Sequence, residues 1–327
     1  MKNIISFFRG LYGHIPSSLY FLAIVTLPLF ASCQSATDET MPSEGEDNLC
    51  TINFAINNYQ QISLDDLSDL ASTRAQTPTN HPSTLAHLIV AVFDAESGQP
   101  VIEPIQHDYA DYETNPYRYP MFTVTLPYGT YRIAILGYNG SKACQITSAN
   151  EINWAEGYVP HTFLYTEELT IDKNTVIDKK ISLRRVVSAF HLTAEDAVPA
   201  DLKKMRFIST TDGGTILDAT TGFAMQSTGY KYDINVPSDY AGKKGLECTF
   251  YIFLPEQELT TNLTVQALGT EDEVLFERNF TDVPLRINTM TMWKGEMFTK
   301  QSEEGSMGFT FEWDTEWTDI IDLNDEA

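Results

Sequence analysis

The sequence predicts an all-β protein, with two tandem antiparallel β-sandwich domains behind a signal peptide and a flexible tether. Many short segments alternate apolar with polar residues and end at Gly, Pro, Asn or Asp, as the strands of sandwiches do. Convincing helical periodicity is absent, and the weak candidate at Asp65–Ala71 is short. The 327 residues suffice for two domains of ordinary size. The expected segments are the signal peptide at 1–32, the tether at 33–48 and the sandwiches at 49–183 and 184–327.

The N-terminus has the pattern of a bacterial lipoprotein signal. Lys2 and Arg9 precede an apolar run at 19–30, which has signal-peptide length and is too short to count as a spanning helix. Small residues then lead into Cys33, which in such signals is acylated and becomes the first residue. The position three before the cysteine, usually Leu, holds Phe30. The alternative is an ordinary secretory signal that leaves a free thiol, which is unusual in an oxidising compartment.

The charge of the chain excludes some partners. The formal net charge is −24, and the predicted signal peptide contributes no Asp or Glu. An acidic surface argues against nucleic acid and against direct binding to anionic membranes, because both require Lys and Arg against phosphate. The tether is polar and acidic, so it is expected to stay flexible. An acidic tract behind a lipidated cysteine resembles the surface-export signal of Bacteroidetes lipoproteins, and a plain solvated linker is the alternative.

The first predicted sandwich begins at Cys50–Ile56, where apolar and polar residues alternate as in a half-buried strand. A stretch rich in Thr, Pro, Asn and Ser follows at 72–83 and is expected to be a long exposed loop. It holds a single arginine, Arg74. Leu85–Phe93 is apolar at most positions, which predicts a central strand.

A β-hairpin is predicted next. Met121–Leu126 alternates cleanly, Pro127–Gly129 supplies a turn, and 131–137 returns as a second strand. Two more strands are expected at 169–171 and 176–183.

The second half begins with an apolar run at 184–192 and again consists of short predicted strands separated by turns. A second hairpin is expected between 263–268 and 274–276, across the turn at 269–273. The other strands expected in this half are Lys204–Ile208, Thr249–Leu254, Met290–Phe298 and Gly308–Trp313.

Residues that could carry catalysis are few, and the sequence predicts a protein that is not an enzyme and needs no cofactor. The histidines never fall at the spacing of a metal site, and no nucleophile elbow, phosphate-binding loop or dinucleotide fingerprint is present. Asp212–Gly214 and Glu271–Glu273 have the composition of calcium turns, but single acidic turns are usually solvated, so no metal site is predicted. Cys50, Cys144 and Cys248 are too far apart for a zinc site and are expected mostly to be small buried hydrophobes, with room for one bridge.

A tyrosine-rich stretch is the candidate binding surface. Tyr109, Tyr112, Tyr117 and Tyr119 lie between Asp108 and Pro120, with Asn and Arg among them. This composition suits stacking on sugars or contact with a protein. The alternative is a loop that its own rings pack onto the sandwich.

Several motifs together resemble the fimbrillin superfamily of Bacteroidetes, the lipoprotein precursors of type V pili and their minor subunits. Each motif is weak alone, but their order and spacing span most of the chain after the signal. The residues that carry the resemblance are the lipoprotein box ending at Cys33, Leu88–Asp94 with Gly98, Leu126–Tyr131, Leu183–Val187, Phe253–Pro255, and Asn279–Asn288 leading to Thr291 and Gly295.

The resemblance implies two transthyretin-like sandwiches and a structural or adhesive role, at the tip or in an accessory position among others. In that family an arginine-specific protease cuts an N-terminal loop, and the lost first strand is replaced by a strand of the next subunit. Arg74 matches the cut position, Thr51–Leu64 would leave with the lipid, and Gly308–Leu323 is the candidate donor. Anchor and some accessory subunits are not cut, and Arg74 would then be an ordinary loop residue.

The expected partners are other pilus subunits, a host or bacterial surface protein or glycan, and the outer membrane through the lipid on Cys33. The expected location is the surface of the outer membrane, with incorporation into fimbriae. The alternative is a monomeric surface lipoprotein that binds a glycan or a protein through its loops.

Overall fold

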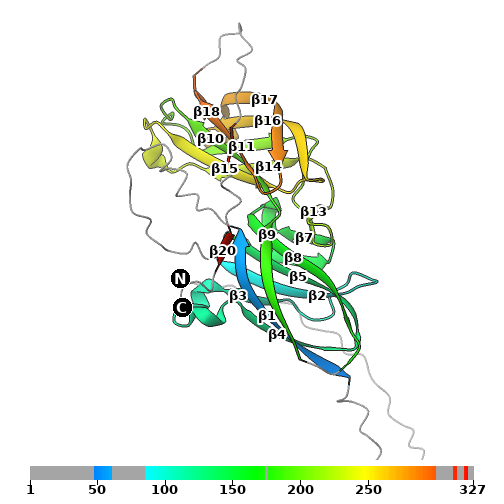
Figure 1. Cartoon of the computed structure of the whole chain (residues 1–327). Helices are drawn as coiled ribbons and strands as arrows, with labels where there is room; N and C mark the ends of the chain where they lie inside the picture. The colour runs from blue at the N-terminus through cyan, green and yellow to red at the C-terminus, as the bar shows by residue number, and fades with distance from the viewer. Residues whose placement is uncertain (1–47, 61–84, 174–175, 300–311, 315–319, 323–327) are drawn as a thin grey trace, which may run out of the picture. The chain divides into compact units, whose positions relative to one another are not determined.

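The computed structural model describes residues 48–60, 85–173, 176–299, 312–314 and 320–322 (Figure 1). Cys33, Arg74 and the weak helix candidate at 65–71 lie outside these residues. The prediction of an all-β protein is confirmed: within the described ranges the regular elements are β-strands and short 3₁₀ turns. In the same ranges there is no helix long and apolar enough to cross a membrane.

Strands of the first half of the chain form an eight-stranded sheet together with β20 from the C-terminal part. Its order is β20-β1-β9-β8-β5-β2-β3, and β4 also pairs with β1. The bounds are β1 Leu49–Gln60, β2 His87–Asp94, β3 Ile105–Asp108, β4 Met121–Pro127, β5 Gly129–Asn139, β8 His161–Ile171, β9 Val176–Arg185 and β20 Ile320–Asp322. β9 links the two parts of this sheet, because most of it pairs with β1 and its last two residues pair with β8.

Alternation along the strands places one side-chain face in a common core. In β1 the residues Cys50, Ile52, Phe54 and Ile56 are at most 2% exposed, while their neighbours are less buried. Strands β2, β4, β5, β8 and β9 send apolar residues into the same cluster, here called the smaller core. In β1 and β4 successive side chains point in turn toward the core and away from it, as the alternation in their sequences predicts.

Strand β2 is central, as predicted, and is buried on both faces. It lies between β3 and β5, and its six middle residues are all buried. Leu88 and Val90 belong to the smaller core. Ile89 and Ala91 face the other way into a larger core that also contains residues of the second half.

The predicted hairpin between Met121–Leu126 and 131–137 is wrong in its pairing. Both strands form, but β4 pairs with β1 and β5 pairs with β2 and β8. Phe122 on β4 and Ile133 on β5 nevertheless point into the same smaller core. The turn therefore joins a strand that pairs with β1 to a strand that lies between β2 and β8 in the same eight-stranded sheet. Apolar alternation does not distinguish this connection from a hairpin.

The second half contributes two four-stranded sheets, β15-β10-β18-β19 and β14-β11-β16-β17. The predicted hairpin across the turn at 269–273 is confirmed, since β16 and β17 pair in antiparallel register. The bounds are β10 Ser188–Ala194, β11 Lys204–Ser209, β14 Tyr230–Asn235, β15 Leu246–Ile252, β16 Glu258–Leu268, β17 Val274–Arg286, β18 Met290–Gly295 and β19 Glu312–Asp314.

Aromatic side chains fill the larger core. The ring centroids of Phe190 and Phe250 are 5.6 Å apart, and those of Phe207 and Phe250 are 4.5 Å apart. A small fourth sheet, β13-β12-β7-β6, adds residues to the same cluster. Its strands are β6 Cys144–Ser148, β7 Glu151–Trp154, β12 Leu217–Asp218 and β13 Phe223–Ala224.

The described cysteines behave as small hydrophobes. Cys50 lies in the smaller core, and Cys248 lies in the larger one. Cys144 and Cys248 carry free thiols. Burial raises the pKa of both of these thiols to about 12, so neither is a ready nucleophile at neutral pH.

His191 on β10 predicts a loss of stability in acid. Burial lowers its pKa from 6.5 to about 4, and its Nδ1 lies 2.7 Å from Thr249 Oγ1. Between pH 6.5 and about pH 4, His191 is therefore protonated in the unfolded chain and neutral in the folded chain. This histidine is expected to cost about 3 kcal/mol of unfolding free energy as the pH falls from 6.5 to 4.

Urea unfolding of the wild type and of His191→Gln at pH 7 and pH 4 measures this effect. The variant is expected to lose less stability than the wild type by that amount. Equal losses in the two proteins would show that His191 does not titrate in this window.

Candidate functional site

Three turns meet at the end of β9, and each carries residues of a motif noted in the sequence. They are the turns between β9 and β10, between β15 and β16, and between β17 and β18. Asn288 N–H donates to Val187 O at 3.0 Å, and Ile287 N–H donates to Gln257 O at 2.9 Å. Asn288 has φ +60°, a left-handed conformation that asparagine tolerates better than most residues. Backbone hydrogen bonds thus join three turns that are far apart in the sequence.

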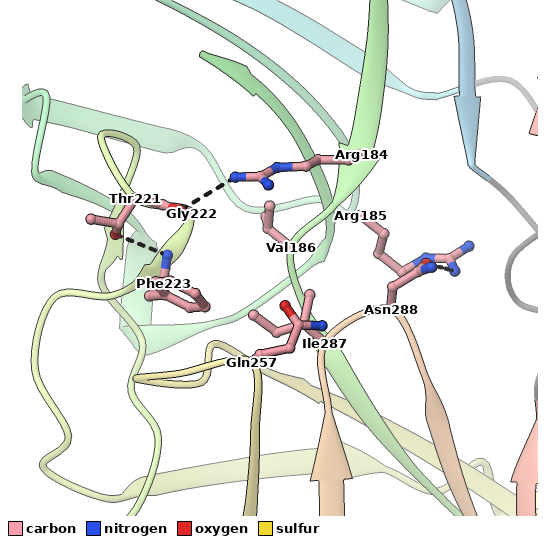
Figure 2. Close-up of a pocket in the computed structure, with 9 residues that line it drawn as sticks. All are labelled: Arg184, Arg185, Val186, Thr221, Gly222, Phe223, Gln257, Ile287 and Asn288. Atoms are coloured by element: carbon pink, nitrogen blue, oxygen red, sulfur yellow. Dashed lines mark hydrogen bonds between the residues drawn. The ribbon is translucent and has the colours of Figure 1, made fainter. Parts of the chain in front are cut away.

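A pocket of about 230 Å³ lies among these turns and a fourth turn before β13 (Figure 2). Its residues share a lack of acidic side chains. They are Arg184, Arg185, Val186, Thr221, Gly222, Phe223, Gln257, Ile287 and Asn288.

Arg184 is exposed, and its guanidinium faces the turn before β13. Its Nη2 donates to the Thr221 carbonyl oxygen at 3.3 Å, which is a long hydrogen bond. Gly222 beneath it has φ +83°, and a Cβ at this position would lie 2.9 Å from Arg184 Nη2. Glycine therefore satisfies both the left-handed backbone and the close approach of the guanidinium.

Arg185 points the other way and is 1% exposed. Its Nε donates to His161 Nε2 at 2.7 Å, and its Nη1 donates to Asn288 Oδ1 at 2.7 Å. The guanidinium also lies 5.2 Å from the centroid of the Phe163 ring. Figure 2 shows the two arginines diverging from adjacent positions at the end of β9.

His161 is held neutral in this network. Burial, and then the charge of Arg185, hold its pKa well below the usual value. Its Nε2 accepts a hydrogen bond from Arg185, so the proton of the neutral ring belongs on Nδ1. The ring stacks on Tyr251 with 5.1 Å between centroids. His161 therefore stays neutral at physiological pH, and its role is to accept the Arg185 hydrogen bond and to stack on Tyr251.

The chemistry of the pocket is that of binding. Its lining contains two guanidinium groups, two side-chain amides and a hydroxyl, and it has no side chain that could serve as a nucleophile next to a base. The described parts of the chain contain no group of three or more His, Cys, Asp or Glu residues arranged to hold a metal ion.

The predicted tyrosine surface divides into packed and exposed rings. Tyr119 is 4% exposed and donates its hydroxyl to Leu85 O at 2.6 Å. Tyr109 and Tyr112 are partly buried and lie 5.3 and 5.8 Å from the Tyr119 ring. Tyr117 is 80% exposed. Three of the four tyrosines therefore pack against one another within the loop, which is the alternative that the sequence left open.

The sequence did not predict the pocket, although several of its residues lie in the motifs that carry the family resemblance. Val186, Ile287 and Asn288 all belong to stretches quoted for the family resemblance. The alternation of β9 also separates its two arginines, because Ile181, Leu183 and Arg185 share the buried face. What the sequence did not contain is which turns meet in space.

The sheets define the chain as an all-β, sandwich-type protein, and the pocket among the turns is its candidate site. The chain belongs to the family of unknown function DUF6562, which matches residues 159–325, slightly more than half of its length. No curated protein sequence matches the chain significantly.

Solved structures similar to this chain include fimbrial proteins and candidate adhesins, the class of protein that the sequence motifs resemble. A candidate adhesin from Bacteroides ovatus has 12% identity and a TM-score of 0.42, with 78% of this chain and 88% of that chain covered. The fimbrial anchor protein Mfa2 from Porphyromonas gingivalis has 12% identity and a TM-score of 0.38, with 75% and 90% covered. The tip fimbrial protein Mfa3 from the same organism has 10% identity and a TM-score of 0.34, with 84% and 99% covered. At such values the likeness carries no functional argument.

Proposed function

We propose that this protein is a fimbrillin-like lipoprotein of the cell surface, a structural or adhesive subunit that enters a type V pilus by strand exchange. In this proposal Cys33 carries the lipid that holds the precursor at the outer membrane. Cleavage at Arg74 then releases the subunit together with its first strand. Two observations support this function: the sequence motifs shared with the fimbrillin superfamily, and the position of β1 within its sheet.

The observation that supports it most is the position of β1 inside a sheet. Leu49–Ala55 pairs with β4 along seven positions on one side, and β1 pairs with β9 along eight on the other (Figure 1). Its inward residues are buried in the smaller core. Loss of β1 would open two rows of backbone hydrogen-bonding groups and an apolar groove, both of which an incoming strand satisfies.

The C-terminal segment provides extended chain of the kind a donor needs. β19 pairs with β18 at three positions, and β20 pairs with Asn58–Gln60 of β1 at three positions. Short strand contacts are readily exchanged, because few backbone hydrogen bonds hold them. Gly308–Leu323, the predicted donor, contains both of these strands.

Treatment of the purified precursor with an arginine-specific protease tests this function. We expect cleavage after Arg74, a matching loss of mass, and then oligomers that grow with time. Arg74→Ala is the matched control and is expected to stay monomeric. If the protein isolated from cells always begins at a lipidated Cys33, the cleavage part of the proposal is wrong and an anchor or accessory role replaces it.

Tyr117 favours a second candidate function, a monomeric surface lipoprotein that binds glycans. A tyrosine ring that is 80% exposed offers a face for stacking on a sugar. Tyr117→Ala is expected to abolish binding on a glycan array if this ring is the site. Tyr119→Ala, combined with it in a double variant, would also remove a buried hydrogen bond, so the single variant is the cleaner test.

A further inference from the structure

We propose that the pocket at the end of β9 binds a sugar acid, a pyranose ring that carries a carboxylate. This assignment is independent of cleavage and strand exchange, because the pocket lies wholly among the turns described above. It rests on the charge, the hydrogen-bond donors and the shape of the lining.

The charge of the lining favours an anion. The chain has a formal net charge of −24, yet Arg184 faces a pocket whose lining has no carboxylate. Its one hydrogen bond within the described chain is the long contact with Thr221 O, which leaves most of its five N–H donors to a ligand. Glu258 is beside Gln257 in sequence, but its carboxylate lies 4.0 Å from Arg286 Nε. A carboxylate ligand would match the planar fork of the guanidinium.

The two side-chain amides of the lining, those of Asn288 and Gln257, differ in where they lie. Asn288 Oδ1 is occupied by Arg185 Nη1, so this hydrogen bond fixes the orientation of the amide. The Nδ2 group of Asn288 then has both hydrogens left, and no hydrogen bond from it is found in the part of the chain that the structure describes. The amide of Gln257 likewise makes none there, and it can donate to or accept from a sugar hydroxyl. Figure 2 shows the Asn288 amide turned toward Arg185, on the side away from Arg184, so Gln257 is the amide assigned to the ligand.

The shape of the pocket suits one sugar ring. Its floor includes Val186 and Ile287, which are 2% and 8% exposed, and Phe223 offers a half-buried ring at one wall. Apolar and aromatic surface beside polar groups is the combination that a pyranose requires, with its C–H face against the Phe223 ring and its hydroxyls toward the amide of Gln257. A volume of about 230 Å³ is below the roughly 300–1,000 Å³ of pockets for drug-sized ligands.

Titration of the full-length chain with methyl β-D-glucuronide and with methyl β-D-glucoside tests this proposal. The two differ only at C6, which is a carboxylate in the glucuronide and a hydroxymethyl group in the glucoside. We expect the glucuronide to bind with a dissociation constant on the order of 1 mM, and the glucoside to bind about tenfold more weakly or worse. Arg184→Gln is expected to weaken glucuronide binding about tenfold and to leave the glucoside unaffected.

Arg286→Gln is the matched control, because it removes the same charge from an arginine that does not line the pocket. Equal affinity for the two glycosides would overturn the proposal, as would equal losses in the two arginine variants. Acetate that binds as tightly as the glucuronide would overturn the role assigned to the sugar ring. Thermal unfolding of each variant confirms that Arg184→Gln remains folded, which is expected because Arg184 is exposed.

Discussion

Replacement of Phe54 with alanine is expected to lower the free energy of unfolding by about 3–5 kcal/mol. Phe54 is fully buried in the middle of β1, where it faces the smaller core between β4 and β9. Truncation leaves a cavity whose walls are strands with fixed hydrogen bonds, so the site cannot collapse to fill it. Urea unfolding followed by tryptophan fluorescence measures the loss.

Thr51→Ala on the same strand is the control for Phe54. Thr51 is on the opposite face, and its hydroxyl makes only an exposed contact with Thr125 at 3.4 Å. It is expected to change the free energy of unfolding by no more than about 0.5 kcal/mol. Similar effects of the two substitutions would contradict the placement of β1 as an inner strand, and with it the main support for strand exchange.

Replacement of Arg185 with methionine is expected to cost about 2–5 kcal/mol, whereas the same change at Arg184 costs less than about 0.5 kcal/mol. The two arginines are adjacent in sequence and differ in burial. Methionine at 185 retains much of the packing but leaves His161 Nε2 and Asn288 Oδ1 without the donors that now reach them at 2.7 Å. Comparison of the two variants by thermal and urea unfolding measures the difference.

The Arg185 variant also has a pH signature. The charge of Arg185 helps to hold the pKa of His161 below its usual value, so its removal raises that pKa toward the unfolded value. The wild type loses stability as the pH falls below about 6.5, because only the unfolded chain then protonates this histidine. The variant is expected to start less stable and to lose less on acidification. A parallel pH dependence in wild type and variant would show that His161 and Arg185 are not coupled.

Strands with clean alternation could be predicted from the sequence, but alternation alone did not determine their pairing: the β16–β17 hairpin was predicted correctly and the partner of β4 was not. Cys50–Ile56 and Met121–Leu126 are strands because alternate side chains reach a core. These two strands pair with each other although about 70 residues separate them, and alternation is the same for such a distant partner as for the next strand of a hairpin. The two-residue strands β12 and β13 went unpredicted, because two residues have no period.

The candidate site illustrates the same limit. Residues of motifs near 184, 257 and 288 were visible in the sequence, but a pocket is made by turns that meet, and backbone hydrogen bonds between distant turns leave no periodic pattern. The tyrosine stretch shows the converse. Its composition suggested a binding surface, yet the Tyr119 hydroxyl donates a hydrogen bond to Leu85 O, and the rings of Tyr109 and Tyr112 pack against the Tyr119 ring.

The pairing of β1 has a mechanical consequence. If the chain is held through Cys33, a pull on the N-terminal end of β1 along the strand loads its hydrogen bonds to β4 and β9 together. Bonds loaded together in shear must break almost simultaneously, whereas bonds peeled from one end break one at a time. The strand is therefore suited to bear tension while it is intact, and rupture under force would be governed by its unfolding barrier rather than by its equilibrium stability.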